Sequence, residues 1–188
     1  MKSMKTSSFC ITILALSLLI LVPAETSEAK KWGIGVSYET RDADPGRGFG
    51  LRLERSILSS LPLVNVDLRA HFSYFSEDVD SYRDIQAPAE LDVYDFGLSA
   101  IGGINLGLLS PYVGAGLGSE SFSAVQTGVQ DRNVDENSFY WNFYGGVAFP
   151  LLRVIKPFAE YRFTRLMGSD EFDYSHNSRI AIGVTLKF

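Results

Sequence analysis

Two residues near the C-terminus, His176 and Ser178, have the types and spacing of a catalytic base and its nucleophile. On an extended strand they would share one face, because side chains alternate with period two. A serine beside a histidine can be an activated nucleophile. The third group that would orient the histidine is missing, since no acidic residue follows Ser178 and Asp173 is only a loop neighbour. A polar loop edge entering a strand fits the same residues, and we favour this non-catalytic interpretation.

Charged residues recur at alternate positions in several segments, opposite an apolar face. If the polar faces are enclosed, these charges must be paired or hydrogen-bonded. We therefore predict an interior polar network. His71 joins it as a hydrogen-bonding member rather than a metal ligand, since no second inward His or Cys completes a site; no cofactor is expected. The predicted network comprises Glu39, Arg52, Glu54, Asp67, Arg69, His71, Asp95, Glu160, Arg162 and Arg179, and Lys187 adds a fifth inward cation.

Eight segments with period-two alternation could position these side chains. The chain is rich in glycine and aromatic residues, and its prolines fall near the expected turns, which is typical of an all-β fold. The mild charge, 17 basic against 22 acidic residues, contains no basic stripe for nucleic acid. The expected strands are 32–40, 47–55, 63–75, 91–103, 111–118, 139–149, 157–165 and 177–188.

The connections between these strands alternate in length. Those after the second, fourth and sixth strands are compact, whereas 76–90 and 119–138 are expected to be long polar loops. Short turns on one side and longer loops on the other are typical of outer-membrane barrels. The apolar faces also carry aromatic rings toward the strand ends, such as Trp32 and Trp141, which matches interfacial girdles. A soluble lipocalin-type barrel or β-sandwich is the alternative, because alternation alone does not say which face meets water.

The N-terminal residues have the pattern of a secretory signal peptide. Lys2 and Lys5 precede an apolar run from residue 9 to 22, and small residues follow Pro23. We predict that residues 1–29 are removed and that 30–188 form one barrel domain; a cut after Ala24 and a single-span anchor are the alternatives. Cys10 would leave with the signal, so no disulfide is expected in the mature chain.

The C-terminal strand resembles the closing strand of bacterial outer-membrane β-barrels. Its apolar face consists of Ile180, Ile182, Val184, Leu186 and Phe188. Residues 30–188 as a whole resemble the small eight-stranded outer-membrane barrels, a family that includes the membrane domain of outer membrane protein A, the opacity-type adhesins and outer membrane protein X. Residues 112–118 and 157–163 also carry the likeness. The resemblance implies an eight-stranded antiparallel up-and-down transmembrane barrel in the bacterial outer membrane. It further implies that the barrel assembly machinery reads the terminal strand.

The resemblance leaves several functions open. Family members are envelope structural proteins, adhesins or small pores. The His176–Ser178 spacing is also similar to the His-x-Ser of lipid A deacylase, although Arg179 stands where that family has asparagine. We predict a non-enzymatic, structural or surface-interacting monomer. A narrow passive channel for small solutes is the first alternative, and a lipid A-modifying enzyme is the second.

Acidic residues concentrate in the expected loops. There, carboxylates could share Ca²⁺ or Mg²⁺ with lipopolysaccharide phosphates, although simple solvation of surface loops explains them too. Outer-membrane lipid and lipopolysaccharide are therefore the expected partners. The expected loop acids are Glu77, Asp78, Asp80, Asp84, Glu90, Glu120, Asp131, Asp135, Glu136, Asp170, Glu171 and Asp173.

Overall fold

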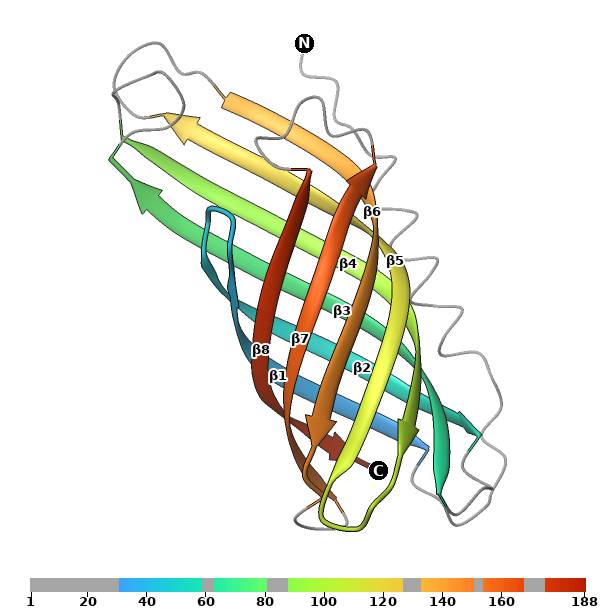
Figure 1. The fold of residues 1–188 in the computed structure, drawn as a ribbon. Helices are drawn as coiled ribbons and strands as arrows, with labels where there is room; N and C mark the ends of the chain where they lie inside the picture. The colour runs from blue at the N-terminus through green and yellow to red at the C-terminus, as the bar shows by residue number, and fades with distance from the viewer. Residues whose placement is uncertain (1–30, 59–62, 81–87, 127–132, 151–153, 168–174) are drawn as a thin grey trace.

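The computed structural model describes residues 31–58, 63–80, 88–126, 133–150, 154–167 and 175–188. In this part of the chain, eight antiparallel strands form one closed barrel, which confirms the predicted fold class (Figure 1). No helix in the described residues is long and apolar enough to cross a membrane. The strands are β1 (Trp32–Arg41), β2 (Arg47–Leu58), β3 (Val64–Val79), β4 (Ala89–Ile104), β5 (Ser110–Gln126), β6 (Asn133–Ala148), β7 (Ile155–Met167) and β8 (His176–Lys187).

The barrel closes along a seam between its first and last strands. β1 and β8 pair from Gly33 opposite Lys187 to Arg41 opposite Arg179. Beyond the ladder, Trp32 and Phe188 exchange two backbone hydrogen bonds of 3.0 and 2.8 Å. We call the end that holds Trp32, Phe188 and the β4–β5 connection the turn end, and the opposite end the loop end. The seam leaves neither β1 nor β8 as an open edge over its paired length.

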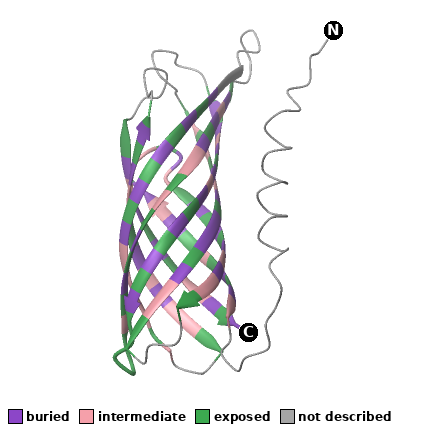
Figure 2. Cartoon of the chain, turned by 90° about the vertical axis from the view of Figure 1, so that its right-hand side faces the viewer, coloured by how far each residue is buried: buried purple, intermediate pink, exposed green. Residues whose placement is uncertain are grey.

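Buried and exposed residues alternate along the strands (Figure 2). Over most of the barrel the buried positions are polar or charged and the exposed ones are apolar. The exposed fraction of Ile34 is 50%, of Leu117 64% and of Ile182 63%, whereas Arg69 and Arg179 expose 2% and 1%. A soluble barrel would bury its apolar face and expose the charges. The observed arrangement is that of a barrel whose outside faces hydrocarbon.

Four strands extend further toward the loop end than the sequence pattern predicted. β5 continues to Gln126 and β6 begins at Asn133, so the predicted loop 119–138 is wrong over most of its length. The predicted loop 76–90 likewise contains the end of β3 and the beginning of β4. Serines at 119, 121 and 123 resemble the composition of a loop, but they alternate with Phe122 and Ala124, which are buried. Side chains still alternate between the two faces, but over residues 121–124 of β5 the polar side chains face outward and the apolar ones face inward.

The connection between β4 and β5 is a compact turn. Leu106 donates a backbone hydrogen bond of 2.9 Å to the carbonyl of Leu109. Gly107 has φ of 86°, in the left-handed region that favours glycine, and its N–H lies 3.3 Å from the Asn105 Oδ1 that accepts it. The turn thereby reverses the chain over 105–109, as the short predicted connection required.

A charge on the outward face should test the lipid-facing assignment. Val36 lies in the middle of β1 and exposes 58% of its surface. We expect Val36→Arg to lower the free energy of unfolding in phospholipid vesicles by about 2–4 kcal/mol, the cost of a cation near the bilayer midplane. Ser121→Arg, on the outward face of β5 at the loop end, should cost less than about 1 kcal/mol. Equal losses in the two variants would contradict the assignment.

Candidate functional site

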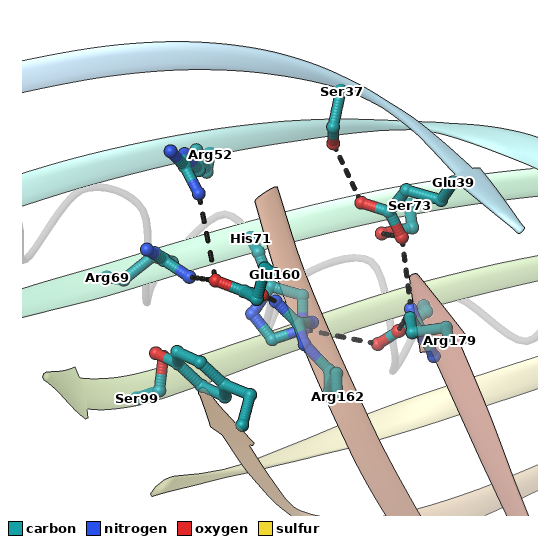
Figure 3. Close-up of polar contacts among 12 residues, drawn as sticks. Ser37, Glu39, Arg52, Arg69, His71, Ser73, Ser99, Glu160, Arg162 and Arg179 are labelled. Atoms are coloured by element: carbon teal, nitrogen blue, oxygen red, sulfur yellow. Dashed lines mark hydrogen bonds and ion pairs between the residues drawn. The ribbon is translucent and has the colours of Figure 1, made fainter. Parts of the chain in front are cut away.

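The structure places all ten residues of the predicted polar network inside the barrel. None exposes more than 8% of its surface. They come from six strands, β1, β2, β3, β4, β7 and β8, so residues far apart in sequence meet across the lumen. Most of their contacts fall into two clusters, one nearer the turn end and one nearer the loop end, and Figure 3 shows several of these contacts. The residues are Glu39, Arg52, Glu54, Asp67, Arg69, His71, Asp95, Glu160, Arg162 and Arg179.

The cluster nearer the turn end is organised by two glutamates. Arg69 joins them across the barrel, with Nη1 2.5 Å from Glu160 Oε2 and Nη2 3.0 Å from Glu54 Oε1. Arg162 adds a 2.8 Å contact to Glu160 Oε1, and Arg52 lies 3.5 Å from Glu54 and 3.8 Å from Glu160. Each carboxylate therefore contacts more than one cation, which offsets the large cost of burying charge.

The cluster nearer the loop end is organised by Asp95 and Arg179. Arg179 Nη1 lies 2.5 Å from Asp95 Oδ2 and 3.4 Å from Glu39 Oε2. The Tyr140 hydroxyl donates a short hydrogen bond to Asp95 and lies 3.1 Å from His71 Nε2. His71 is thus a member of the hydrogen-bonded network. Among the described residues, no three His, Cys, Asp or Glu side chains are arranged to hold a metal ion.

Three buried charged residues of this region were not predicted as interior. Arg41 lies 3.0 Å from Glu120 and donates hydrogen bonds to the carbonyls of Asp44 and Pro45. Glu120 and Glu136 were expected in an acidic loop, and this was wrong, because they expose 0% and 9% on the extended β5 and β6. The available signal was spacing, since Glu120 continues the inward series of glycines at 114, 116 and 118.

Aromatic rings fill the space beside the guanidinium groups. Arg52 stacks over Phe158 at 3.1 Å from the ring centroid, and Arg69 and Arg162 each lie 5.0 Å from the centroid of Tyr144. Glycines on β4, β5 and β6 make room for the inward tyrosines, so that a Cβ at Gly118 would collide with the Tyr140 ring. The region around the two clusters is therefore a packed core of charges and rings rather than a hollow tube.

Above the loop-end cluster the interior becomes apolar, which the sequence pattern did not predict. Phe75, Leu91 and Val93 expose 1% or less and pack with Ala89, Phe122 and Ala124. Arg41 and Arg179 approach the Phe75 ring at 4.7 and 5.3 Å from its centroid. We call these six apolar residues the apolar plug. It lies between the ionic clusters and the loop end.

The possible catalytic pair lies on the outward face of β8. His176 is exposed, its Nδ1 is 3.3 Å from Ser175 Oγ, and its ring lies against Phe163 at 5.9 Å between centroids. The backbone N–H of Ser178 donates to Asp42 at 2.7 Å. In the described part of the chain, no carboxylate contacts His176, and Asp173 lies outside that part.

The expected loop acids other than the buried Glu120 and Glu136 are exposed, half-buried or outside the described residues, and Asp135 lies on β6. Asp78 on β3, Asp80 just after it and Glu90 on β4 are exposed. Glu77 is half-buried and accepts a 2.8 Å hydrogen bond from the Gly46 N–H. Five further acids, Asp84, Asp131, Asp170, Glu171 and Asp173, lie outside the described residues, as do residues 1–29.

Comparison with known proteins agrees with this architecture. The family model "Outer membrane protein beta-barrel domain" matches residues 11–188. The chain belongs to this family of outer-membrane β-barrels. It is accordingly a protein of the bacterial outer membrane, its outward apolar side contacts membrane lipid, and in such barrels the turn end faces the periplasm. No curated protein matches the sequence.

Three solved structures share the fold at low sequence identity. A major outer membrane protein from Thermus thermophilus is 10% identical with a TM-score of 0.68, covering 84% of this chain and 98% of that one. The N-terminal barrel domain of Pseudomonas aeruginosa OprF is 15% identical with a TM-score of 0.61, covering 86% and 100%. Neisserial surface protein A is 16% identical with a TM-score of 0.58, covering 87% and 100%. The likeness is one of fold.

Removing one carboxylate should show how far the ionic clusters stabilise the barrel. Glu160 exposes 3% and is contacted by three arginines. We expect Glu160→Gln to lower the free energy of unfolding by about 3–5 kcal/mol, because it leaves buried guanidinium groups without their partner. The exposed Glu90→Gln is the matched control and should change it by less than about 1 kcal/mol. Urea unfolding in phospholipid vesicles measures both, and similar values would contradict the argument.

Proposed function

We propose that this protein is a non-catalytic outer-membrane barrel with a structural and surface-interacting role, exerted by an extension of the barrel at the loop end. One observation carries the proposal. The β2–β3 pairing stops at Gly48 opposite Phe75, and the β6–β7 pairing stops at Phe139 opposite Met167. β3–β4 and β5–β6 nevertheless continue to Val79 and Asn133 (Figure 1). We call the part of β3–β6 beyond these points the platform.

The platform differs chemically from the barrel beneath it. Its inward face carries the apolar plug, whose residues pack β3, β4 and β5 together, and its outward face is polar. Asp78 lies directly opposite Glu90 on that outward face, and Asp80 is exposed nearby. An outward face that carries exposed carboxylates is suited to water and to polar partners rather than to hydrocarbon.

The carboxylates indicate which partner this face suits. Like charges directly opposite on neighbouring strands repel each other, and a divalent cation between them removes that repulsion. Oxygen ligands suit Ca²⁺ and Mg²⁺. Two or three carboxylates supply part of a coordination shell, and phosphate oxygens of lipopolysaccharide would supply the rest. The proposed partner of the outward face is therefore lipopolysaccharide, bridged by divalent ions.

Neutralising this face tests the proposal. Asp78→Asn, Asp80→Asn and Glu90→Gln combined should remove most of the rise in thermal unfolding midpoint that lipopolysaccharide with Mg²⁺ gives the wild type over phospholipid alone. Ser119→Ala with Ser121→Ala, on the same outward face, is the uncharged control and should keep that rise. EDTA should abolish it in wild type and control alike. Equal stabilisation of the triple variant and the wild type would overturn the proposed partner.

A passive channel is the second candidate, because family members include small pores, but the packed interior favours a closed barrel. Paired charges fill the middle of the lumen, and the apolar plug lies above them. We expect the refolded mature chain to show no stable conductance level in planar bilayers. Phe75→Ala combined with Arg179→Ala should raise conductance, since it removes side chains of both layers. A steady open level in the wild type would establish a channel instead.

Four further elements of the proposal concern export, assembly, oligomeric state and catalysis. Residues 1–29 act as a cleaved export signal, and residues 30–188 are the mature barrel. The terminal strand, with Ile180, Ile182, Val184, Leu186 and Phe188 as its apolar set, is read by the barrel assembly machinery, and the protein acts as a monomer. A role without catalysis is supported by the surroundings of His176, which packs against the Phe163 ring and in the described part of the chain contacts no carboxylate that would orient it.

A further inference from the structure

A polar cavity lies inside the barrel at the turn end. Its volume is about 330 Å³, within the range of small-molecule sites. Inward residues near the turn end of β2, β3, β4, β5, β6, β7 and β8 line it. The cavity lies on the turn-end side of the ionic cluster around Glu54 and Glu160, so its approach is from the periplasm rather than from the outside.

The lining carries more positive than negative charge. Its four cations are Arg52, Arg69, Lys156 and Lys187, and its two anions are Glu54 and Asp67. Glu54 already contacts three of these cations, with Arg69 at 3.0 Å, Lys187 at 2.9 Å and Arg52 at 3.5 Å. Asp67 accepts hydrogen bonds from Ser56 at 2.5 Å and from Asn65 at 3.1 Å. Glu160, which is not part of the lining, pairs with Arg69 at 2.5 Å. Three carboxylates therefore face four cations, and positive charge is still in excess.

Lys156 contributes most clearly to this excess of positive charge. It is half-buried at the start of β7, directly opposite Thr185 on β8, two residues before Lys187. In the described part of the chain, the structure gives the Lys156 ammonium neither an ion pair nor a hydrogen bond. Lys187 exposes only 6% of its surface, and it shares its one carboxylate, Glu54, with two arginines. Two lysines on neighbouring strands thus line one cavity, and among the described residues Glu54, which contacts Lys187, is the one carboxylate in contact with either of them.

Such a cavity concentrates anions. Low-dielectric walls that carry one sign of charge focus the field and raise the local concentration of the opposite ion. Arg52 is held in place by donating to the Thr185 hydroxyl, and amide side chains at 65 and 105 add neutral donors at the rim. Donors of this kind form strong charge-assisted hydrogen bonds with oxyanions.

We propose that this cavity is a binding site for a small soluble oxyanion, a phosphate or carboxylate compound, that enters from the periplasm and is held by Lys156 and Lys187. The site is separate from the platform and does not depend on the partner proposed there. It also requires no passage through the barrel, because the ionic clusters close its inner side. The barrel then has a ligand site on its periplasmic side in addition to its outer surface.

Calorimetric titration tests the site with two probes. Mature protein refolded in nonionic detergent is titrated with inorganic phosphate and, separately, with acetate, each against chloride at equal ionic strength. We expect saturable binding of at least one probe. Tighter binding of phosphate would indicate a phosphate site, and tighter binding of acetate would indicate a carboxylate site. Lys156→Met should weaken binding about tenfold, the loss of one charge-assisted contact, and Lys156→Arg should retain it.

Lys31→Met is the matched control, because Lys31 lies next to the first residue of β1 but is not part of the lining. It should leave the affinity unchanged. Lys187→Met should also weaken binding, but this substitution removes an ion-pair partner of Glu54. Lys156→Met is therefore the decisive variant, because it leaves no carboxylate without its partner. Failure of both probes to bind the wild type, or equal affinity in Lys156→Met and Lys31→Met, would overturn the site. Neither result bears on lipopolysaccharide binding by the platform.

Discussion

Hydrocarbon offers no hydrogen-bond partner to a backbone, and the rest of this structure depends on that constraint. Every N–H and C=O within the bilayer must be satisfied by the protein, which leaves a closed barrel as the only solution for strands. The β1–β8 ladder and the paired bonds between Trp32 and Phe188 provide the closure. Once the seam is closed, alternation determines what each side chain meets, lipid on one face and the lumen on the other.

Eight strands enclose a space that is only wide enough for side chains, and this second consequence shapes the interior. Long cationic side chains reach across it, so that Arg69 on β3 contacts Glu160 on β7 and Arg179 on β8 contacts Asp95 on β4. Large rings need small neighbours, which is why Tyr140 and Tyr144 face glycines on β4 and β5. The same inward-facing residues therefore both fill the lumen and pair its charges.

Period two was enough to predict which side chains enter the lumen, and Arg69, Asp95 and Arg162 show this. It could not predict which of them meet, because Arg69 and Glu160 are separated by 91 residues and their contact depends on the tilt of the strands. The alternation itself continues at the loop end, but the expectation that polar side chains face inward failed there, because Phe122 and Ala124 face inward and the serines beside them face outward. Alternation assigns a face but does not show where along a strand the membrane ends.

The charges of the lumen are unevenly distributed along the barrel axis. Near the loop end Arg41 and Arg179 lie among Glu39, Asp95 and Glu120, whereas near the turn end the cations outnumber Glu54 and Asp67. The closest ion pairs lie within the two clusters, with 2.5 Å between Arg69 and Glu160 and 2.5 Å between Arg179 and Asp95. A charge without a close partner is least costly where water reaches it. Lys156 at the turn end and the carboxylates of the platform are in such positions. The cost of burying a charge therefore explains both the paired charges inside the barrel and the charges of opposite sign that stay available at its two ends.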